Sequence, residues 1–215
     1  MNKKTLFLIV AILFFVYSLP AQQVRKTPTG LGIEAGMGYN IMTRSEKNRS
    51  GGDSVNRYNR FWMQPCLRLH YDITVKNFGK SNSLKVKTFL SYYTFGGKFK
   101  LPNDKGEYDI YSFASFEAGA GLSVDFNNMF QVSPLIKGHY VFTPLKRYIR
   151  EITKPADNIK EDVFPFGCNI GVQLRFKYKH FTIGAEGWYG LTDILNSPGY
   201  VAKESNFRLM AGYEF

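Results

Sequence analysis

The chain has 215 residues, a formal net charge of +11 and a sequence pI of about 9.6. Its length suits one domain. The basic residues are spread along the chain instead of gathering in one stretch, and a nucleic-acid partner is therefore not expected, since such a partner needs cations concentrated on one face. Only two cysteines are present, which excludes a disulfide-rich scaffold.

The first 21 residues have the layout of a secretory signal peptide. Two lysines precede an apolar run from Leu6 to Val16, which is too short to cross a bilayer, and small and polar residues follow it. We expect cleavage near Ala21, which removes both lysines and leaves residues 22–215 as one domain with a charge of +9. A short N-terminal anchor is the alternative.

Segments that alternate between apolar and polar residues recur along the rest of the chain. Side chains of a strand point to opposite faces with period two, so each segment predicts a β-strand. About eight are found, and no helical periodicity of comparable length competes with them. In chain order they cover residues 30–41, 64–73, 84–95, 112–126, 130–142, 169–178, 181–191 and 206–215. The third is ambiguous, because its aromatic residues share a parity with its lysines: Phe89, Tyr93 and Phe95 with Lys85 and Lys87.

The connections between these strands alternate in length. The first, TRSEKNRSGGDSVNRYNR, is long and polar, whereas Lys179 and His180 alone join the sixth strand to the seventh. An up-and-down barrel places alternate connections at opposite ends, and outer-membrane barrels have short periplasmic turns and long extracellular loops. With eight strands, both termini then lie on the short-turn side.

Periodicity alone does not say which face points inward. A soluble, lipocalin-like barrel places the apolar face inside, whereas a membrane barrel turns it toward lipid. Three features favour the membrane barrel: the loop alternation, a polar parity that mixes both charge signs with glycine, and aromatic residues at the strand ends. These are Tyr71, Phe126, Phe130, Tyr178, Phe181, Tyr213 and Phe215 at the short-turn end, and Tyr39, Phe61, Tyr140, Phe142, Tyr189 and Phe207 at the other.

We therefore expect an all-β protein, an eight-stranded antiparallel up-and-down transmembrane β-barrel. Over about residues 30–215 the chain resembles small outer-membrane β-barrel proteins of the OmpX and OmpA transmembrane-domain type. Its AQQ mature start and basic character are also similar to PorT-like barrels of Bacteroidota. In such families the barrel assembly machinery reads a C-terminal strand that ends in Phe, and the resemblance implies that role for Tyr213 and Phe215.

Polar residues of the inward parity are predicted to form a network in the lumen. Opposite charges in a narrow, low-dielectric space must pair or cost several kcal/mol, so we interpret them as structural salt bridges. An eight-stranded barrel is just wide enough to be filled by side chains, which disfavours a general porin. The predicted set is Glu34, Arg68, His70, Glu117, Lys137, His139, Arg175, Glu186, Arg208 and Glu214.

The sequence predicts a non-porin barrel of the bacterial outer membrane, with both termini periplasmic. Its role would be structural, adhesive or linked to assembly or secretion through its long extracellular loops. The alternatives are a soluble exported barrel that binds a small apolar ligand and an outer-membrane hydrolase. We expect no enzyme activity, because the long loops contain no histidine, and no cofactor or metal, because nothing brings the lone inward histidines together.

The predicted partners are outer-membrane lipid, the barrel assembly machinery, and an extracellular or secretion-complex protein that the sequence does not identify. Loop one carries five cations and two carboxylates, a net +3: Arg44, Lys47, Arg49, Arg57 and Arg60 against Glu46 and Asp53. Such a loop attracts lipopolysaccharide phosphates or an acidic protein, and an ordinary solvated loop explains it as well.

The turns fix the expected strand register. A two-residue turn pairs Tyr178 with Phe181, which places Gln173 opposite Glu186 and Arg175 diagonal to Glu186. A three-residue turn pairs Phe126 with Phe130 on the outside, which places Glu117 opposite His139 in the lumen. Cys66 and Cys168 fall on non-adjacent strands with opposite orientations, so both are predicted to be free thiols.

Overall fold

The computed structural model describes residues 30–46, 56–59, 64–78, 81–100, 108–149, 157–158, 164–194 and 200–215. The predicted signal peptide, Phe61 and residues 47–55 of the first loop lie outside this part of the chain. None of the described segments is a helix long and apolar enough to cross a membrane.

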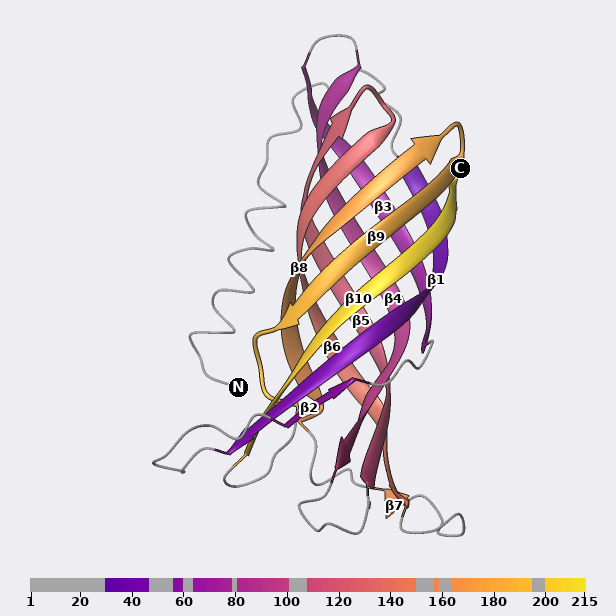
Figure 1. Cartoon of the computed structure of the whole chain (residues 1–215). Helices are drawn as coiled ribbons and strands as arrows, with labels where there is room; N and C mark the ends of the chain where they lie inside the picture. Colours follow the sequence, from indigo (N-terminus) through magenta and orange to yellow (C-terminus); the bar gives the residue numbers. More distant parts are fainter. Residues whose placement is uncertain are drawn as a thin grey trace.

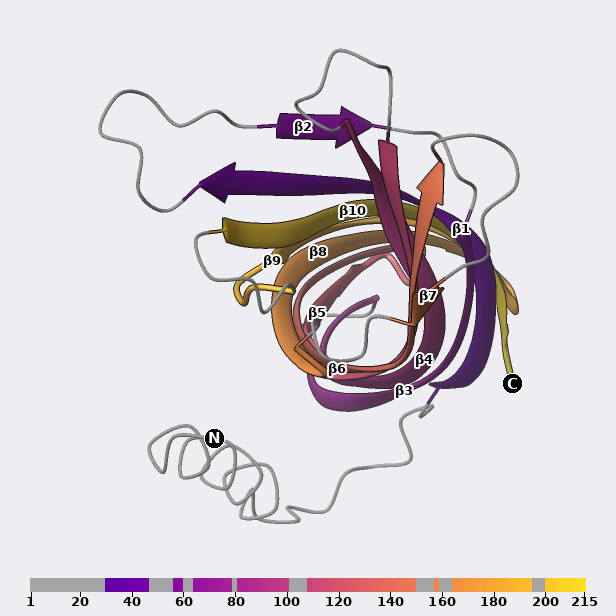
Figure 2. The same cartoon turned by 90° about the horizontal axis from the view of Figure 1, so that it is seen from below.

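Eight long strands form one closed antiparallel barrel (Figures 1 and 2). They are β1 (Gly30–Glu46), β3 (Gln64–Phe78), β4 (Asn82–Lys100), β5 (Tyr108–Phe126), β6 (Phe130–Ile149), β8 (Phe166–Tyr178), β9 (Phe181–Gly190) and β10 (Tyr200–Glu214). Each pairs with the next, and β10 closes the barrel against β1. The short strands β2 (Asn56–Asn59) and β7 (Asp157–Asn158) pair with β1 and β6. The predicted fold class is confirmed.

The short connections gather at one end of the barrel, together with the C-terminus (Figure 1). The predicted turns are both confirmed: Phe126 pairs with Phe130 and Tyr178 with Phe181. The turn residues Asn127, Asn128 and Lys179 have φ angles of 52°, 54° and 54°. Tight turns therefore place three side-chain-bearing residues in the left-handed region, which Asn tolerates better than Lys.

The apolar parity faces outward and the charged parity faces inward. Phe126 and Phe130 are exposed on the outer wall, whereas Glu117 and His139 are buried and lie opposite each other as predicted. Large apolar side chains cover the outside of every barrel strand, among them Leu69, Leu90, Phe116, Ile136, Val172, Ile183, Leu209 and Met37. This orientation is the reverse of that in a soluble ligand-binding barrel.

Strand β4 departs from the pattern because three of its aromatic side chains point into the lumen. Phe89, Tyr93 and Phe95 are all buried beside Lys87. Neighbouring glycine supplies the room: a Cβ atom on Gly119 would lie 2.3 Å from the Phe89 ring. The glycines of the inward parity thus let bulky rings enter a narrow barrel, and this resolves the ambiguous strand of the sequence.

A β-bulge separates the barrel from a raised sheet on the loop side. Ala114 pairs with Thr143 and Ser115 with Val141, so Phe142 is skipped and stacks on Phe116 with ring centroids 4.8 Å apart. Beyond it, β4, β5 and β6 stay paired as far as Lys100, Tyr108 and Ile149, whereas β6 and β8 part at Tyr140 and Phe166. These loop-side parts of β4, β5 and β6, which we call the projecting sheet, extend past the rim of the barrel at the lower end of Figure 1.

Both cysteines are free, as predicted. Cys66 is buried in the lumen on β3, and Cys168 is half-buried on β8.

We predict that Lys179→Gly stabilises the barrel. Glycine removes the cost of a left-handed residue that bears a side chain, which is about 1 kcal/mol. Urea unfolding in lipid vesicles measures the free energy of unfolding. The control Lys179→Ala removes the same charge but keeps the strain, and it should leave the free energy within about 0.5 kcal/mol of the wild type. Equal values for the Gly and Ala variants would contradict the prediction.

Candidate functional site: the charged lumen

The structure places all ten predicted lumen residues inside the barrel, each no more than 6% exposed. They come from seven of the eight barrel strands, and β4 adds Ser91 and Lys87. Tyr213 and Phe215 lie on the outer wall, and their rings, 5.4 Å apart, form an aromatic cluster with Phe181 at the turn end.

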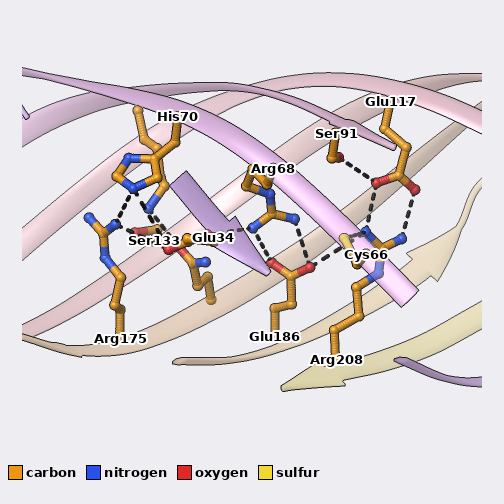
Figure 3. A network of polar contacts seen from close by, with 12 residues as sticks. Glu34, Cys66, Arg68, His70, Ser91, Glu117, Ser133, Arg175, Glu186 and Arg208 are labelled. Carbon is orange, nitrogen blue, oxygen red and sulfur yellow. Dashed lines mark hydrogen bonds and ion pairs between the residues drawn. The ribbon is translucent and has the colours of Figure 1, made fainter. Parts of the chain in front are cut away.

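Seven of these charges alternate in sign along the barrel axis, and Figure 3 shows the series from Arg175 to Glu117. At the turn end, Arg175 bonds Asp72 at 2.5 Å and Glu34 at 3.2 Å. Arg68 lies next, 3.4 Å from Glu34 and 2.7 Å from Glu186. Each cation thus touches a carboxylate on both sides.

The alternation continues to the loop end. Glu186 lies 3.6 Å from Arg208, and Arg208 lies 2.6 Å from Glu117, which also accepts a 2.5 Å hydrogen bond from Lys137. We call the series the lumen ladder; it consists of Arg175, Glu34, Arg68, Glu186, Arg208, Glu117 and Lys137.

Two rungs of the ladder have fork geometry. The two terminal nitrogens of Arg68 donate to both oxygens of Glu186 at 2.7 and 2.8 Å, and those of Arg208 to both oxygens of Glu117 at 2.6 and 2.7 Å. Paired, bidentate contacts of this kind are among the strongest hydrogen bonds that proteins form. They offset the large cost of removing four charges from water.

The described lumen charges balance. Seven buried carboxylates face five buried cations, and two half-buried lysines at the turn end, Lys85 and Lys177, pair with Asp125 and Glu214. The chain has 28 basic and 17 acidic residues in all, so its entire basic excess lies outside this set.

Aromatic faces cover the cations on their remaining sides. The guanidinium carbon of Arg208 lies 3.5 Å from the centre of the Tyr93 ring, and that of Arg68 lies 4.4 Å from the centre of Phe89. The ammonium of Lys137 lies 4.5 Å from the Trp188 ring. Cation–π contact adds to the pairing where water is excluded.

An aromatic plug fills the lumen between the ladder and the loop end. Phe95 packs between Tyr93 and Phe113, with ring centroids 6.1 and 5.0 Å away. Ile194, which follows β9, is buried in the same cluster. Its backbone amide donates a 2.8 Å hydrogen bond to the carbonyl of Ala202. Within the described part of the barrel, plug and ladder together occupy the lumen with side chains.

The predicted register of β8 and β9 is confirmed, because Gln173 lies opposite Glu186 and Arg175 is diagonal to it. The side chain of Arg175 nevertheless reaches across the lumen to Asp72, Glu34 and Glu214. Arg68 and Arg208 occupy Glu186 instead. The register along the sheet was predictable, whereas the choice of partner depends on which strands face each other across the closed barrel.

The predicted set lacks four buried charged residues of the lumen: Asp72, Lys87, Asp125 and Glu204. Asp72 shares its parity with Arg68 and His70, so extending the alternation along the strand was sufficient to find it. Lys87 lies on the ambiguous strand, and Glu204 precedes the segment taken as the last strand.

The two inward histidines lie in separate surroundings. Nε2 of His70 is 3.0 Å from Arg175 and Nδ1 is 3.4 Å from Asp72, whereas His139 contacts Asn169 at 3.0 Å near the aromatic plug. Within the described part of the chain, no three His, Cys, Asp or Glu side chains are arranged to hold a metal ion.

An outer wall of exposed apolar side chains around a charged, internally paired lumen defines a small transmembrane β-barrel of the outer-membrane type. The expected likeness to OmpX-type barrels is confirmed at the level of the fold. No protein-family description matches the chain, and no curated protein matches it in sequence. The narrower similarity to PorT-like barrels therefore stays a prediction.

Comparison with solved structures finds similar outer-membrane proteins at low sequence identity. Ail of Yersinia pestis, in complex with the heparin analogue sucrose octasulfate, is 16% identical over 88% of this chain and 100% of its own, with a TM-score of 0.48. Neisserial surface protein A is 11% identical over 86% and 97%, with a TM-score of 0.44. The outer-membrane protease OmpT of Escherichia coli is 11% identical over 90% and 99%, with a TM-score of 0.41.

We predict strong coupling between Arg68 and Glu186. Glu186→Leu leaves Arg68 with only the 3.4 Å contact to Glu34, and Arg68→Met leaves Glu186 with only the 3.6 Å contact to Arg208. Each change unbalances the buried charge and should destabilise the barrel by about 3–5 kcal/mol, while the double variant regains most of that loss. Glu34 and Arg208 keep Arg175 and Glu117 as partners in the double variant. The measurement is urea unfolding in vesicles.

A rim pair serves as the control for this cycle. The side chain of Lys85, 16% exposed, pairs with Asp125 at the turn end, where water partly reaches the pair, so Lys85→Met should cost less than either ladder variant. Additive losses for the Arg68 and Glu186 variants would show that the two charges act independently.

Proposed function

We propose that the protein is a non-conducting, non-enzymatic barrel of the bacterial outer membrane that holds the projecting sheet outside the cell as an adhesive surface. The short turns and the C-terminus lie together at one end, which supports a periplasmic position for both termini. Residues 1–21 would direct export, and the C-terminal strand with Tyr213 and Phe215 would be recognised by the barrel assembly machinery.

The filled lumen argues against a channel. The lumen ladder runs along the barrel axis with contacts of 2.5 to 3.6 Å, and the aromatic plug lies between it and the loop end. A solute would have to break buried ion pairs to pass, at several kcal/mol each. The lumen is therefore better suited to bracing the wall than to transport.

The projecting sheet is the observation that carries the adhesive role. It continues regular pairing of β4 with β5 and of β5 with β6 well beyond the last β6–β8 pair. Extended strands raised above a membrane present backbone and side chains that a macromolecule can contact. A stabilising role alone would not require strands that continue past the rim. Membership of a secretion complex is the alternative use of the same surface.

We predict no steady conductance for the purified protein in planar bilayers. The ladder and the plug obstruct the axis whatever voltage is applied. Discrete, reproducible single-channel current steps from folded protein would refute the non-conducting assignment. Folding is checked by the change in gel mobility between unheated and boiled samples in SDS.

Shortening the projecting sheet should abolish adhesion without unfolding the barrel. Gly97 pairs with Tyr111, so replacing residues 98–110 with an Asn-Gly turn keeps the register of β4 and β5. Cells that express this variant should lose attachment to protein-coated wells at least tenfold. A closed barrel is expected to resist SDS until it is boiled, so the variant should still show a gel-mobility shift on heating if it folds. Deleting residues 195–199 is the control. Equal attachment by the wild type and the shortened variant would exclude the projecting sheet as the adhesive surface.

A further inference from the structure

The outer wall carries a shallow apolar groove at mid-height across β8, β9 and β10, which extends toward β5 and β6. Its floor is formed by Ala185 and Gly187, and its walls by Val172, Leu174 and Phe207, with Tyr189 at the loop end. Gly187 pairs with Val172 on one side and with Phe207 on the other. A residue without a side chain thus lies between two large ones, which produces a hollow in the wall.

The hollow at Gly187 is open space. A Cβ atom built on this glycine would meet no atom within 4 Å, and the backbone is not in the left-handed region. Glycine is therefore not required here by packing or by backbone conformation. The missing side chain leaves the outer wall concave at a height that faces the hydrocarbon of the bilayer.

Polarity rises in steps from the groove toward the loop end. Phe207, Ser205 and Lys203 follow one another on the outward face of β10. The ammonium of Lys203 lies 6.0 Å from the centre of the Tyr189 ring, which also lines the groove. Within the described part of the chain, no carboxylate pairs with Lys203. The apolar groove is thus followed by the Ser205 hydroxyl and then by the Lys203 ammonium, which lies against the Tyr189 ring.

We propose that this groove binds one phosphorylated glycolipid of the extracellular leaflet, with an acyl chain along Ala185 and Gly187 and a phosphate at Lys203. An acyl chain fits because the trough is apolar and lies within the lipid-facing belt. An anionic headgroup fits because the Lys203 ammonium stands at the loop end of the trough, and a cation near a membrane surface attracts anionic lipid headgroups. The choice of leaflet rests on the proposed orientation, with the loops outside the cell.

The experiment measures lipid retained by the purified barrel after detergent washing, by mass spectrometry of the intact complex. The probes are a diphosphorylated glucosamine-based glycolipid, the same lipid with its phosphates removed, and phosphatidylglycerol. We expect one molecule of the phosphorylated glycolipid to be retained, with at least tenfold less of the other two. Retention of phosphatidylglycerol at the same level would overturn the assignment to a glycolipid.

Two variants test the two halves of the groove. Gly187→Leu should fill the hollow and reduce retention at least tenfold. Gly138→Leu is the matched control, because Gly138 is another exposed glycine of the outer wall that does not line the groove, and a Cβ atom added to it would meet only one atom, 3.8 Å away. Lys203→Gln should weaken retention and Lys203→Arg restore it, while Lys179→Gln at the turn end has no effect. Unchanged retention in Gly187→Leu would overturn the proposal.

Orientation is measured separately. Labelling of Lys179→Cys by an impermeant maleimide on intact cells tests whether the turn end is periplasmic, and the binding measurement in detergent does not depend on it. Labelling in intact cells would therefore refute the proposed orientation and the choice of leaflet, while the groove itself would still be judged by lipid retention.

Discussion

The structure depends on one electrostatic requirement, which is that charges enclosed in a narrow barrel must be paired. The lumen ladder meets this requirement with alternating cations and carboxylates at hydrogen-bonding distance. A shift of one residue along any strand would turn its lumen charges toward lipid, at roughly 2–4 kcal/mol for each Lys or Arg near the bilayer midplane. Strand register, face assignment and the filled interior all follow from this requirement.

Much of the fold was predictable because the membrane imposes a period of two on the sequence. Alternation located the strands, turn length fixed the pairing of Phe126 with Phe130, and parity placed Glu117 beside His139. These are local properties of neighbouring strands. The membrane barrel was preferred over a soluble one because charge and glycine shared one parity, and the buried ladder explains that coincidence.

The contacts that the sequence did not reveal join strands that face each other only once the barrel is closed. Arg175 is diagonal to Glu186 along the sheet, as predicted, yet its side chain bonds Asp72 and Glu34 across the lumen. Such partners depend on barrel diameter and strand stagger, which single-strand patterns do not encode. The rings of β4 were ambiguous for a related reason, since Phe89 enters the lumen only where Gly119 leaves space.

The ladder also has a consequence for how the chain enters its membrane. Arg68 and Glu186 are separated by 118 positions in the chain, and Glu117 and Arg208 by 91. No hairpin of consecutive strands contains both members of either pair, so a partly inserted sheet would carry these charges uncompensated into hydrocarbon. These charges are neutralised only when strands that are distant in the chain face each other in the closed barrel. Entry into the bilayer and closure of the barrel are thereby coupled into one late, cooperative step, slowed by the long sequence separation of its contacts.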